Sequence, residues 1–333
     1  MYKNVVFSGI GTYHPPKQVD NSHFIEHFHK ANIEVNGLMN HLGRKTRHFA
    51  DAENENTVTM AFEAAKKAIL NAHISAEDIN LIIFATDTPE HICPTNAMLL
   101  NDRLNAKNAH MVFDINSNCI GMLTAVDVAS RIIQNNPEIN KGLVVGSFFG
   151  SLVSSKADPV CYSNMADAAA ALVLERKEEN RRRGFIDSNF KTDPVVKDKF
   201  LFPVCGFSKM YDDHIDMEDK KLKMDPFDTS FISREWCDLI TGMLDKNNVD
   251  KNSVKQYFFS QFSKPDAEST LDMLGLSRDS HTFIGDKYGY TGVTSPFIAY
   301  NAALDEKKVD ENDNVVFCSV GAGYNICSML YRL

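Results

Sequence analysis

FDINSNCIGMLTAVDVAS, residues 113–130, joins a short apolar stretch to an amphipathic helix, with Cys119 between the two. Residues 110–113 are typical of a short buried strand. After Gly121, apolar residues recur three and four positions apart, which predicts a helix with one buried face. That face consists of Met122, Ala125, Val126, Ala129, Ile132 and Ile133. The pattern therefore puts Cys119 at or just before the first turn of a helix.

A thiol in that position has a physical reason to be reactive. Unpaired N–H groups and the positive end of the helix dipole lie at a helix N-terminus, so we expect the pKa of Cys119 to fall from about 8.5 toward neutrality. Gly121 lets a backbone or a substrate approach closely. The alternative is an inert core cysteine, since free cysteines are among the most buried residues.

The composition restricts the class of protein. The chain has 333 residues, 44% hydrophobic and 24% charged, enough for one large α/β core or two fused domains. No apolar run approaches a membrane span and the N-terminus begins as a strand, so we expect a cytoplasmic protein that does not enter membranes. The net charge of −9 argues against a nucleic-acid partner. Seven scattered cysteines without a C-x-x-C pair indicate neither disulfides nor a metal site.

Outward from Cys119, strands and helices alternate along the whole chain, and the order in the first half returns in the second. Such alternation is typical of a layered α/β fold, and its repetition indicates an internal duplication. The strands expected are 5–9, 81–85, 110–114, 142–146, 169–174, 256–259, 281–284, 314–319 and 326–332. The helices expected are 57–71, 94–104, one after Cys119, 233–245, 267–274 and 295–304.

The chain divides into three parts on this pattern. Residues 1–177 form an N-terminal half that carries the cysteine, and residues 229–333 form a C-terminal half. Residues 178–228 between them are polar and rich in turn formers, so we expect an irregular linker that doubles as a lid over the site.

Six blocks, in order and at matching spacing, resemble the 3-oxoacyl-[acyl-carrier-protein] synthase III family over nearly the whole chain. They are VVFSGIGTYHPPKQVDN (5–21), LGRKTRHFADAENENTVTMAFEAAKKAI (42–69), INLIIFATDTPEHICPTNA (79–97), FDINSNCIGM (113–122), NMADAAAALVLE (164–175) and VGAGYNICSMLYRL (320–333). The resemblance implies the family's thiolase-like duplicated fold of five layers, α-β-α-β-α. It also implies a homodimeric acyltransferase of fatty-acid-related or specialised metabolism, with no tightly bound cofactor.

The resemblance assigns roles to particular residues. Cys119 matches the cysteine that takes the acyl group as a thioester, and the backbone N–H groups of Cys119 and Ala322 match the oxyanion hole. Two catalytic positions depart from the family. Gln261 in FFSQFSKPD stands where a histidine is expected, and Tyr290 in YGYTGVTS stands where an asparagine is expected. Both can donate a hydrogen bond, but neither is a good base at neutral pH.

The substrate-binding positions depart as well. Gly37 and His41 match the Trp and Arg that clamp the adenine ring of coenzyme A, so the stacking partner is absent. Cys93, beside Pro94, matches a wall of the pocket that is related by the dimer axis, and Phe207 is expected along the acyl tunnel. Acyl-CoA or an acyl-carrier protein is the implied donor. The candidate docking charges are Lys45, Arg47, Arg181, Arg182 and Arg183.

Three functions follow from these departures. The first is an acyltransferase that loads Cys119 and passes the acyl group to an acceptor without the usual decarboxylation. The second is a catalytically degenerate partner in a heterodimer with another ketosynthase. The third is a decarboxylating 3-oxoacyl-ACP synthase III that uses atypical carbonyl-binding residues.

Overall fold

The structure is a computed structural model that describes residues 1–333, and its largest feature is a nine-stranded sheet in the order β11-β12-β13-β8-β1-β7-β6-β4-β5. The strands are β1 (Tyr2–Tyr13), β4 (Leu81–Ala85), β5 (Met111–Ile115), β6 (Lys141–Phe149), β7 (Asp167–Glu179), β8 (Gly184–Val196), β11 (Val254–Phe259), β12 (Asn314–Gly321) and β13 (Gly323–Arg332). A single residue pair, Val5 with Gly184, joins β1 to β8. The sheet is therefore two sheets that touch at one point.

The two sheets repeat one pairing scheme. In the first, β1 and β7 pair antiparallel, as do β7 and β6, while β6, β4 and β5 run parallel. In the second, β8 and β13 pair antiparallel, as do β13 and β12, while β12 and β11 run parallel. The predicted internal duplication is confirmed at the level of strand order and direction.

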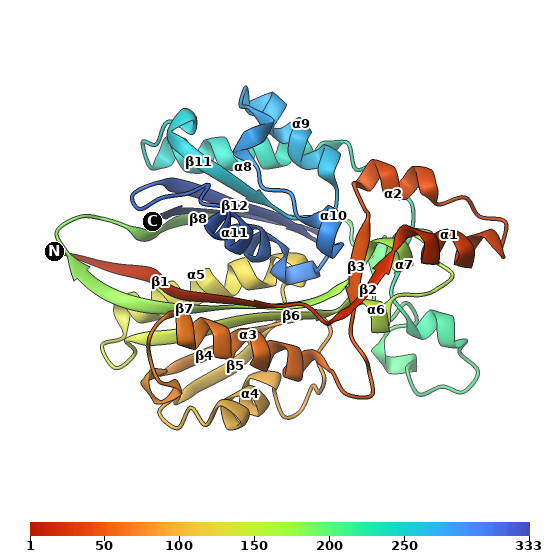
Figure 1. Cartoon of the computed structure of the whole chain (residues 1–333), viewed down its shortest axis with the longest axis horizontal. Helices are drawn as coiled ribbons and strands as arrows, with labels where there is room; N and C mark the ends of the chain where they lie inside the picture. The colour runs from red at the N-terminus through yellow and green to blue at the C-terminus, as the bar shows by residue number, and fades with distance from the viewer.

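Helices cover both faces of both sheets. They are α3 (Thr57–Asn71) and α4 (Asn96–Leu104) outside the first sheet, α5 (Gly121–Asn135) and α11 (Ser295–Asp305) between the sheets, and α8 (Phe231–Lys246) and α9 (Lys264–Leu274) outside the second. Figure 1 shows the five layers stacked from α4 to α9. A core of 32 buried residues fills the space between the sheets, and cores of 19 and 17 residues lie under the outer helices. The five-layer prediction is confirmed.

One predicted strand is wrong. Residues 281–284 were expected to form a strand, but only His281 pairs, through an isolated bridge to Tyr257 of β11. The pairing stops because this segment bonds to glutamine side chains instead of to the backbone of a neighbouring strand. The Thr282 hydroxyl donates to Oε1 of Gln256, and the Ile284 N–H donates to Oε1 of Gln261. The first sheet ends in β5, and the second sheet has only one paired residue, His281, in the equivalent place.

The irregular linker is also wrong in part. Residues 184–196 form β8, which pairs with β13 along its whole length. The strand looked like a loop because its outer half is polar and contains Pro194. Only one residue of β8 pairs with β1, so its other edge is nearly free, and a polar or proline residue costs little there.

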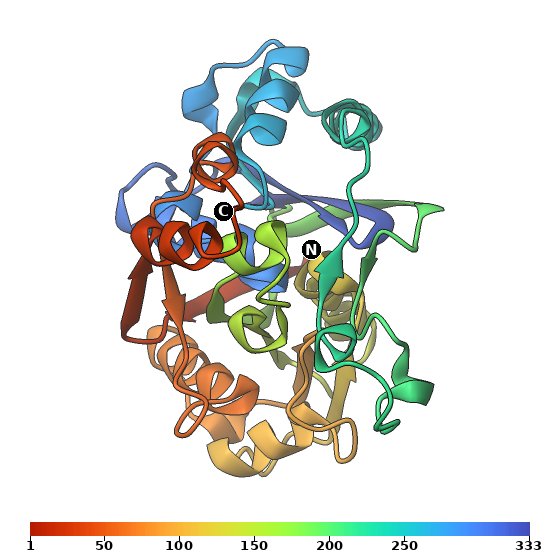
Figure 2. The ribbon, with the colours of Figure 1, turned by 90° about the vertical axis from the view of Figure 1, so that its right-hand side faces the viewer.

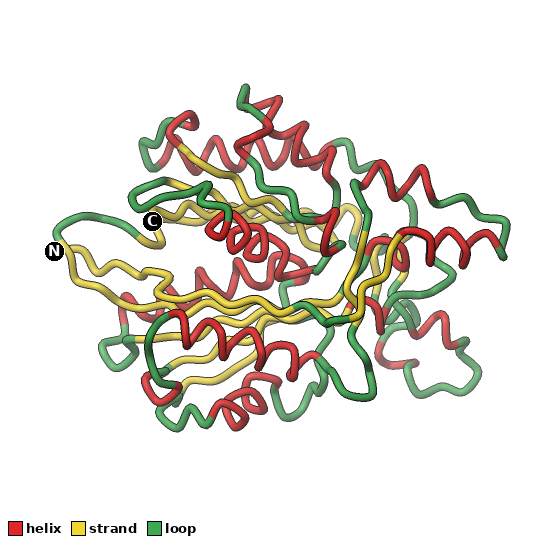
Figure 3. Tube along the Cα trace, in the orientation of Figure 1, coloured by secondary structure: helices red, strands yellow, loops and turns green.

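Shorter elements gather at one end of the molecule, opposite the chain termini (Figure 1), and Figure 2 looks onto that end. They are β2 (Lys17–Asp20), α1 (Asn21–His29), α2 (Asn36–Leu42), β3 (Thr46–Phe49), α6 (Gly150–Val153), α7 (Pro159–Asn164), β9 (Phe200–Leu201), β10 (Lys223–Met224) and α10 (Gly285–Tyr288). Long loops connect them, as the tube in Figure 3 makes clear. No helix combines the length and the apolar character needed to cross a bilayer.

Candidate active site

Cys119 lies in a 3₁₀ turn, Asn118–Ile120, that leads from β5 into α5. Asn118 has φ +50, a left-handed conformation that asparagine tolerates better than most residues. Its Nδ2 donates to the Ala322 carbonyl at 3.2 Å, and Oγ of Ser319 donates to the Cys119 carbonyl at 3.1 Å. The second half of the molecule therefore holds the cysteine loop of the first half in place.

Three donors favour the charged form of Cys119 and so lower the pKa of its thiol. They are the backbone N–H of Cys119 itself, the backbone N–H of Ala322 and the hydroxyl of Tyr290. Ala322 stands at the turn between β12 and β13, where Gly323 has φ +79 and needs the freedom of glycine. This is the arrangement that stabilises negative charge near a nucleophile.

The expectation of a lowered thiol pKa is wrong. The pKa of Cys119 is raised to about 12, first because burial disfavours the thiolate and then because the charge of Asp87 repels it. The three donors act in the opposite direction but do not outweigh the loss of solvent around a side chain that is 8% exposed. The resting form of Cys119 is a neutral thiol.

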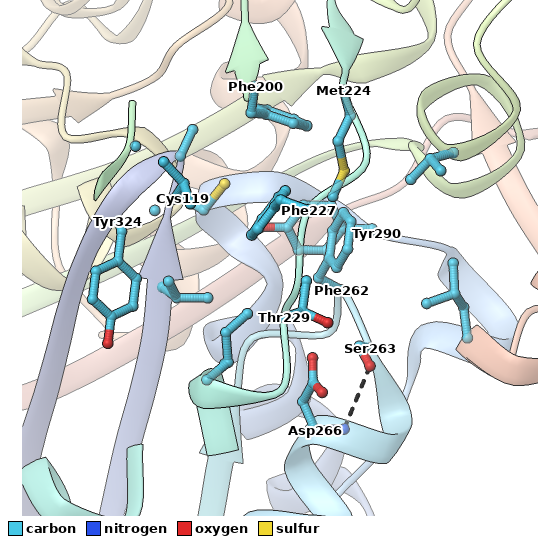
Figure 4. A pocket seen from close by; sticks show the side chains of 18 of the residues that line it. Cys119, Phe200, Met224, Phe227, Thr229, Phe262, Ser263, Asp266, Tyr290 and Tyr324 are labelled. Carbon is cyan, nitrogen blue, oxygen red and sulfur yellow. Dashed lines mark hydrogen bonds between the residues drawn. The ribbon is translucent and has the colours of Figure 1, made fainter. Parts of the chain in front are cut away.

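Cys119 opens onto a pocket of about 240 Å³ whose walls are mostly apolar. Figure 4 shows the thiol and the Tyr290 ring at this pocket, with Asp266 and Ser263 farther along it. The lining comes from α2, α7, the segment 196–232, the start of α9, Tyr290 and the turn 320–324. Those residues are Leu38, His41, Leu42, Cys119, Val160, Val196, Phe200, Met224, Phe227, Thr229, Phe231, Ile232, Phe262, Ser263, Asp266, Tyr290, Val320, Gly321, Ala322, Gly323 and Tyr324.

The segment between β8 and α8 forms one wall of this pocket. Phe200 from β9 and Met224 from β10 belong to that wall, and so does Phe227. Phe231, the first residue of α8, lines the pocket next to them in sequence. The two short strands pair with each other, Lys223 with Leu201 and Met224 with Phe200, so the wall has its own small sheet. Residues of this segment therefore line the pocket, and its role as a lid stays a prediction.

Tyr290 comes to Cys119 from the second half of the chain. Its N–H donates to the Asn164 carbonyl at 2.9 Å and its carbonyl accepts from the Ala166 N–H at 2.8 Å. The ring packs edge-on against Phe262, with the centroids 5.1 Å apart. Burial and the neighbouring thiol raise the pKa of the phenol well above its usual value, so Tyr290 stays a hydrogen-bond donor.

Gln261 does not reach the thiol, contrary to the prediction that it is catalytic. Its Nε2 donates to the Phe259 carbonyl at 2.9 Å, and its Oε1 accepts from the Ile284 N–H at 2.9 Å. The side chain is fully buried and is absent from the pocket lining. Its amide satisfies backbone groups where the second sheet ends, so its role in the structure is to support the fold.

Only one of the four predicted substrate-binding residues lies at the pocket. His41 lines the pocket, but Gly37, Cys93 and Phe207 do not. Phe207 is 54% exposed on the outer surface of the 197–230 segment, so the structure contradicts its place along a tunnel within this chain. Gly37 is the second residue of α2 and has open space around it, and Cys93 is exposed in the loop before α4.

Most of the predicted docking charges are also elsewhere. Arg47 is fully buried. Its Nε donates to the Ser163 carbonyl at 2.7 Å, and its guanidinium also donates to Oδ1 of Asn21. Arg181, Arg182 and Arg183 lie between β7 and β8, at the end of the molecule opposite the pocket. Lys45 is exposed and pairs with Asp286 at 3.6 Å, but it does not line the pocket.

Two acids at this site were missed. Asp266 lines the pocket beside Ser263, and burial raises its pKa. Asp87 follows β4, and burial raises its pKa to about 6. A signal for Asp87 was present, because it follows the carboxyl end of a buried parallel strand, where sites in α/β proteins form. No group of three or more His, Cys, Asp or Glu side chains is arranged to hold a metal ion.

Comparisons with known proteins show which family the chain resembles. The model of the 3-oxoacyl-[acyl-carrier-protein (ACP)] synthase III family matches residues 113–194, and that of its C-terminal part matches residues 244–333. A synthase III of Staphylococcus aureus is 30% identical over 322 residues, 96% of each chain. One from Clostridium perfringens is 28% identical over 332 residues, 99% of this chain and 100% of its own.

A solved structure extends the agreement to the fold. The 3-oxoacyl-[acyl-carrier-protein] synthase III of Aquifex aeolicus superposes with a TM-score of 0.87 over 99% of this chain and 100% of its own, at 24% identity. The matched segments include Cys119, Tyr290 and the turn at Ala322. The chain therefore belongs to the 3-oxoacyl-[acyl-carrier-protein] synthase III family of acyltransferases.

Proposed function

We propose that Cys119 takes an acyl group as a thioester and passes it to an acceptor that brings its own nucleophile, without decarboxylation of a malonyl unit. The observation that carries this proposal is the position of the Cys119 thiol in the lining of an apolar pocket, where three donors favour its charged form. The apolar walls suit an acyl chain, and the donors suit a sulfur or oxygen that becomes negative during transfer.

In the first half-reaction, the Cys119 sulfur bonds to the carbonyl carbon of the donor thioester. The carbonyl oxygen becomes an oxyanion that the N–H groups of Cys119 and Ala322 stabilise. The bond from that carbon to the pantetheine sulfur then breaks, and the pantetheine leaves as a thiol with the proton that Cys119 lost. The donor is acyl-CoA or an acyl-carrier protein, a choice consistent with the names of the related synthases.

The second half-reaction departs from decarboxylative condensation because the expected His and Asn are replaced. Gln261 is occupied by backbone groups, and Tyr290 offers one hydroxyl near the sulfur. Neither arrangement supports the enolate left by departing carbon dioxide. An amine, hydroxyl or carbon acceptor that supplies its own nucleophile needs no such support, and such acceptors fit a place in specialised metabolism.

The test is mass spectrometry of the protein after incubation with acyl-pantetheine, acyl-CoA and acyl-carrier protein. We expect an acyl adduct on the peptide that contains Cys119, its absence in Cys119→Ala, and no carbon dioxide from a malonyl thioester. A wild-type protein that forms no adduct with any donor would contradict the proposal. Carbon dioxide release would favour the decarboxylating synthase instead. Comparing the three donors identifies which carrier is used.

A second candidate is the degenerate subunit of a heterodimeric ketosynthase. It is favoured by the raised pKa of Cys119 and the absence of a histidine beside the thiol. In that case Cys119→Ala leaves the activity of the pair unchanged, and the isolated chain forms no adduct. Copurification with a second ketosynthase, followed by the same variant in the pair, separates the two candidates.

We also propose that the chain forms a homodimer through the side of the first sheet that ends in β5. This strand has a partner on one edge only. Apolar side chains are exposed close by in sequence, with Ile92 at 65%, Met98 at 49% and Met111 at 37%. An unpaired edge beside exposed apolar residues favours association with a second copy. Sedimentation equilibrium measures the state, and a concentration-independent monomer would contradict it.

A further inference from the structure

Asp266 is the only acid among the residues that line the Cys119 pocket. It is the third residue of α9, and Figure 4 shows its carboxylate extending from that helix into the pocket, farther from Cys119 than Tyr290 is. The thiol and the carboxylate therefore open onto the same cavity at separate places.

The start of α9 does not use the carboxylate of Asp266. An acid at the third position of a helix can bond back to the N–H of the N-cap residue. Ser263 is the N-cap and its Oγ accepts from the Asp266 N–H at 3.4 Å, but the return bond is absent. In α3 the return bond is made, because the Asn56 N–H donates to Oγ1 of Thr59 at 2.7 Å. The helix cap therefore leaves the carboxylate available to a ligand.

The pocket offers Asp266 no strong cationic partner. No lysine or arginine lines it, and His41 from α2 is the only lining side chain that can carry a positive charge. His41 acts on Asp266 through its charge alone, and Ser263 is the one hydrogen-bonding side chain that acts on the carboxylate. An ionised carboxylate among apolar walls is costly unless it is paired, so a cationic group of a ligand fits this place.

The walls around the carboxylate restrict the shape of that ligand. Fifteen of the 21 lining residues are hydrophobic, and a cavity of about 240 Å³ is smaller than those that hold drug-sized ligands. A short alkyl chain with a charged end meets both conditions. Because Cys119 faces the same cavity, the other end of such a chain can reach an acyl group on the sulfur.

We propose that Asp266 binds an ammonium group of the acyl acceptor, and that the acceptor is a short linear diamine. Its second amine, uncharged, attacks the carbonyl carbon of the Cys119 thioester. A bond from nitrogen to carbon forms, the bond from carbon to sulfur breaks, and a proton of the attacking amine passes to the sulfur. The products are a monoacylated diamine and the free thiol. This assignment rests on the proposed acyl-thioester function and names its acceptor.

The experiment begins from the isolated acyl-enzyme, so that the rate of loading does not enter. Wild-type protein is acylated with hexanoyl-pantetheine, freed of excess donor, and mixed with equal concentrations of diaminopentane, which has an amine at each end, or of pentylamine. Mass spectrometry follows the loss of the Cys119 adduct and the appearance of the amide. We expect diaminopentane to react about 10- to 100-fold faster, the range for hydrogen bonds to a charged group.

Variants test whether this preference comes from the carboxylate. Asp266→Asn should reduce the ratio of the two rates to within about threefold of unity, because the amide cannot pair with an ammonium. Asp266→Lys should react faster than the wild type with aminohexanoate, which has an amine and a carboxylate at opposite ends. Asp272→Asn, at an exposed acid of α9 outside the pocket lining, should keep the wild-type ratio.

The wild-type ratio needs no variant and decides the matter even if a variant fails to fold. A ratio near unity, or a ratio that Asp266→Asn leaves unchanged, would overturn the proposal. An acyl-enzyme that transfers its acyl group to no amine would overturn it too. Each of these results still leaves an acyl adduct on wild-type Cys119, whereas the complete absence of that adduct contradicts the proposed function itself.

Discussion

The turn before α5 and the turn before α11 occupy equivalent places in the two halves, yet they are built differently. Each is a 3₁₀ turn, Asn118–Ile120 in the first half and Gly292–Thr294 in the second, followed by a helix of the central layer. The first follows β5, a strand with five residues in register beside β4. The second follows a single bridged residue, His281, and the short helix α10.

This difference shows how a duplicated fold divides its chemistry. The regular half presents the thiol, and the irregular half presents the Tyr290 hydroxyl and the Ala322 N–H that face it. Loss of the fifth strand from the second sheet accompanies the use of Gln261 as a backbone partner. The second half thus supports the cysteine loop and favours the charged form of the thiol, while the acid that it brings to the pocket, Asp266, lies farther along the pocket. Four measurements sharpen or break this comparison.

The largest effect concerns the thiol itself. Because the pKa of Cys119 is about 12, its alkylation by iodoacetamide should rise about tenfold for each pH unit, roughly 1000-fold between pH 7 and 10. Peptide mass spectrometry measures the rate, and the exposed Cys93 reports on the reagent in the same sample. A rate that levels off below about pH 9 would contradict the raised pKa and support the earlier expectation that the helix N-terminus lowers it.

The second effect concerns the support from the irregular half. Gln261→Ala leaves the Phe259 carbonyl and the Ile284 N–H buried without partners, at a cost of about 1–3 kcal/mol each. We expect the free energy of unfolding in urea to fall by about 2–5 kcal/mol, while folded protein acylates within about threefold of the wild-type rate. Gln18→Ala, at an exposed position, is the control. A large fall in the acylation rate with an unchanged free energy of unfolding would instead support a catalytic role for Gln261.

The third effect concerns Asp87 and stability. Its folded pKa of about 6 exceeds the unfolded value of 3.8, so the folded state binds more protons between these values and ionisation destabilises it as the pH rises. Asp87→Asn removes this penalty. We expect it to stabilise the protein by up to about 3 kcal/mol above pH 6, with little gain left below about pH 4. Urea unfolding at both pH values measures this, with Glu90→Gln as control, and a variant less stable at pH 7.5 contradicts it.

The smallest effect concerns the donor from the irregular half. Tyr290→Phe removes one hydrogen bond to a sulfur that becomes charged, which corresponds to about 10- to 100-fold in the acylation rate. The ring should keep its packing against Phe262, so the unfolding midpoint should shift little. Tyr211→Phe, at an exposed residue, is the control. An unchanged rate would mean that the backbone N–H groups of Cys119 and Ala322 suffice.

Much of the fold could be predicted because its signals are local. The helix 57–71 was predicted with the bounds that α3 has, and the strands 81–85 and 256–259 fall within β4 and β11. Apolar residues at spacings of two or of three and four report which face of an element is buried, and this needs no knowledge of distant residues. The prediction failed at 184–196, where pairing with β13 overrides a polar sequence, and at 281–284, where side chains end the pairing.

The sequence by itself determined that Cys119 stands between a strand and a helix, and that Tyr290 and Ala322 belong to the loops that meet it. Only the tertiary structure decided the state of the thiol, because the loss of solvent around a sulfur depends on residues from both halves of the chain. It also decided that the Gln261 amide bonds to backbone groups and that the charge of Asp87 raises the pKa of the thiol. Charge and hydrogen bonding at a site depend on distances across the fold, and those distances have no local pattern in the chain.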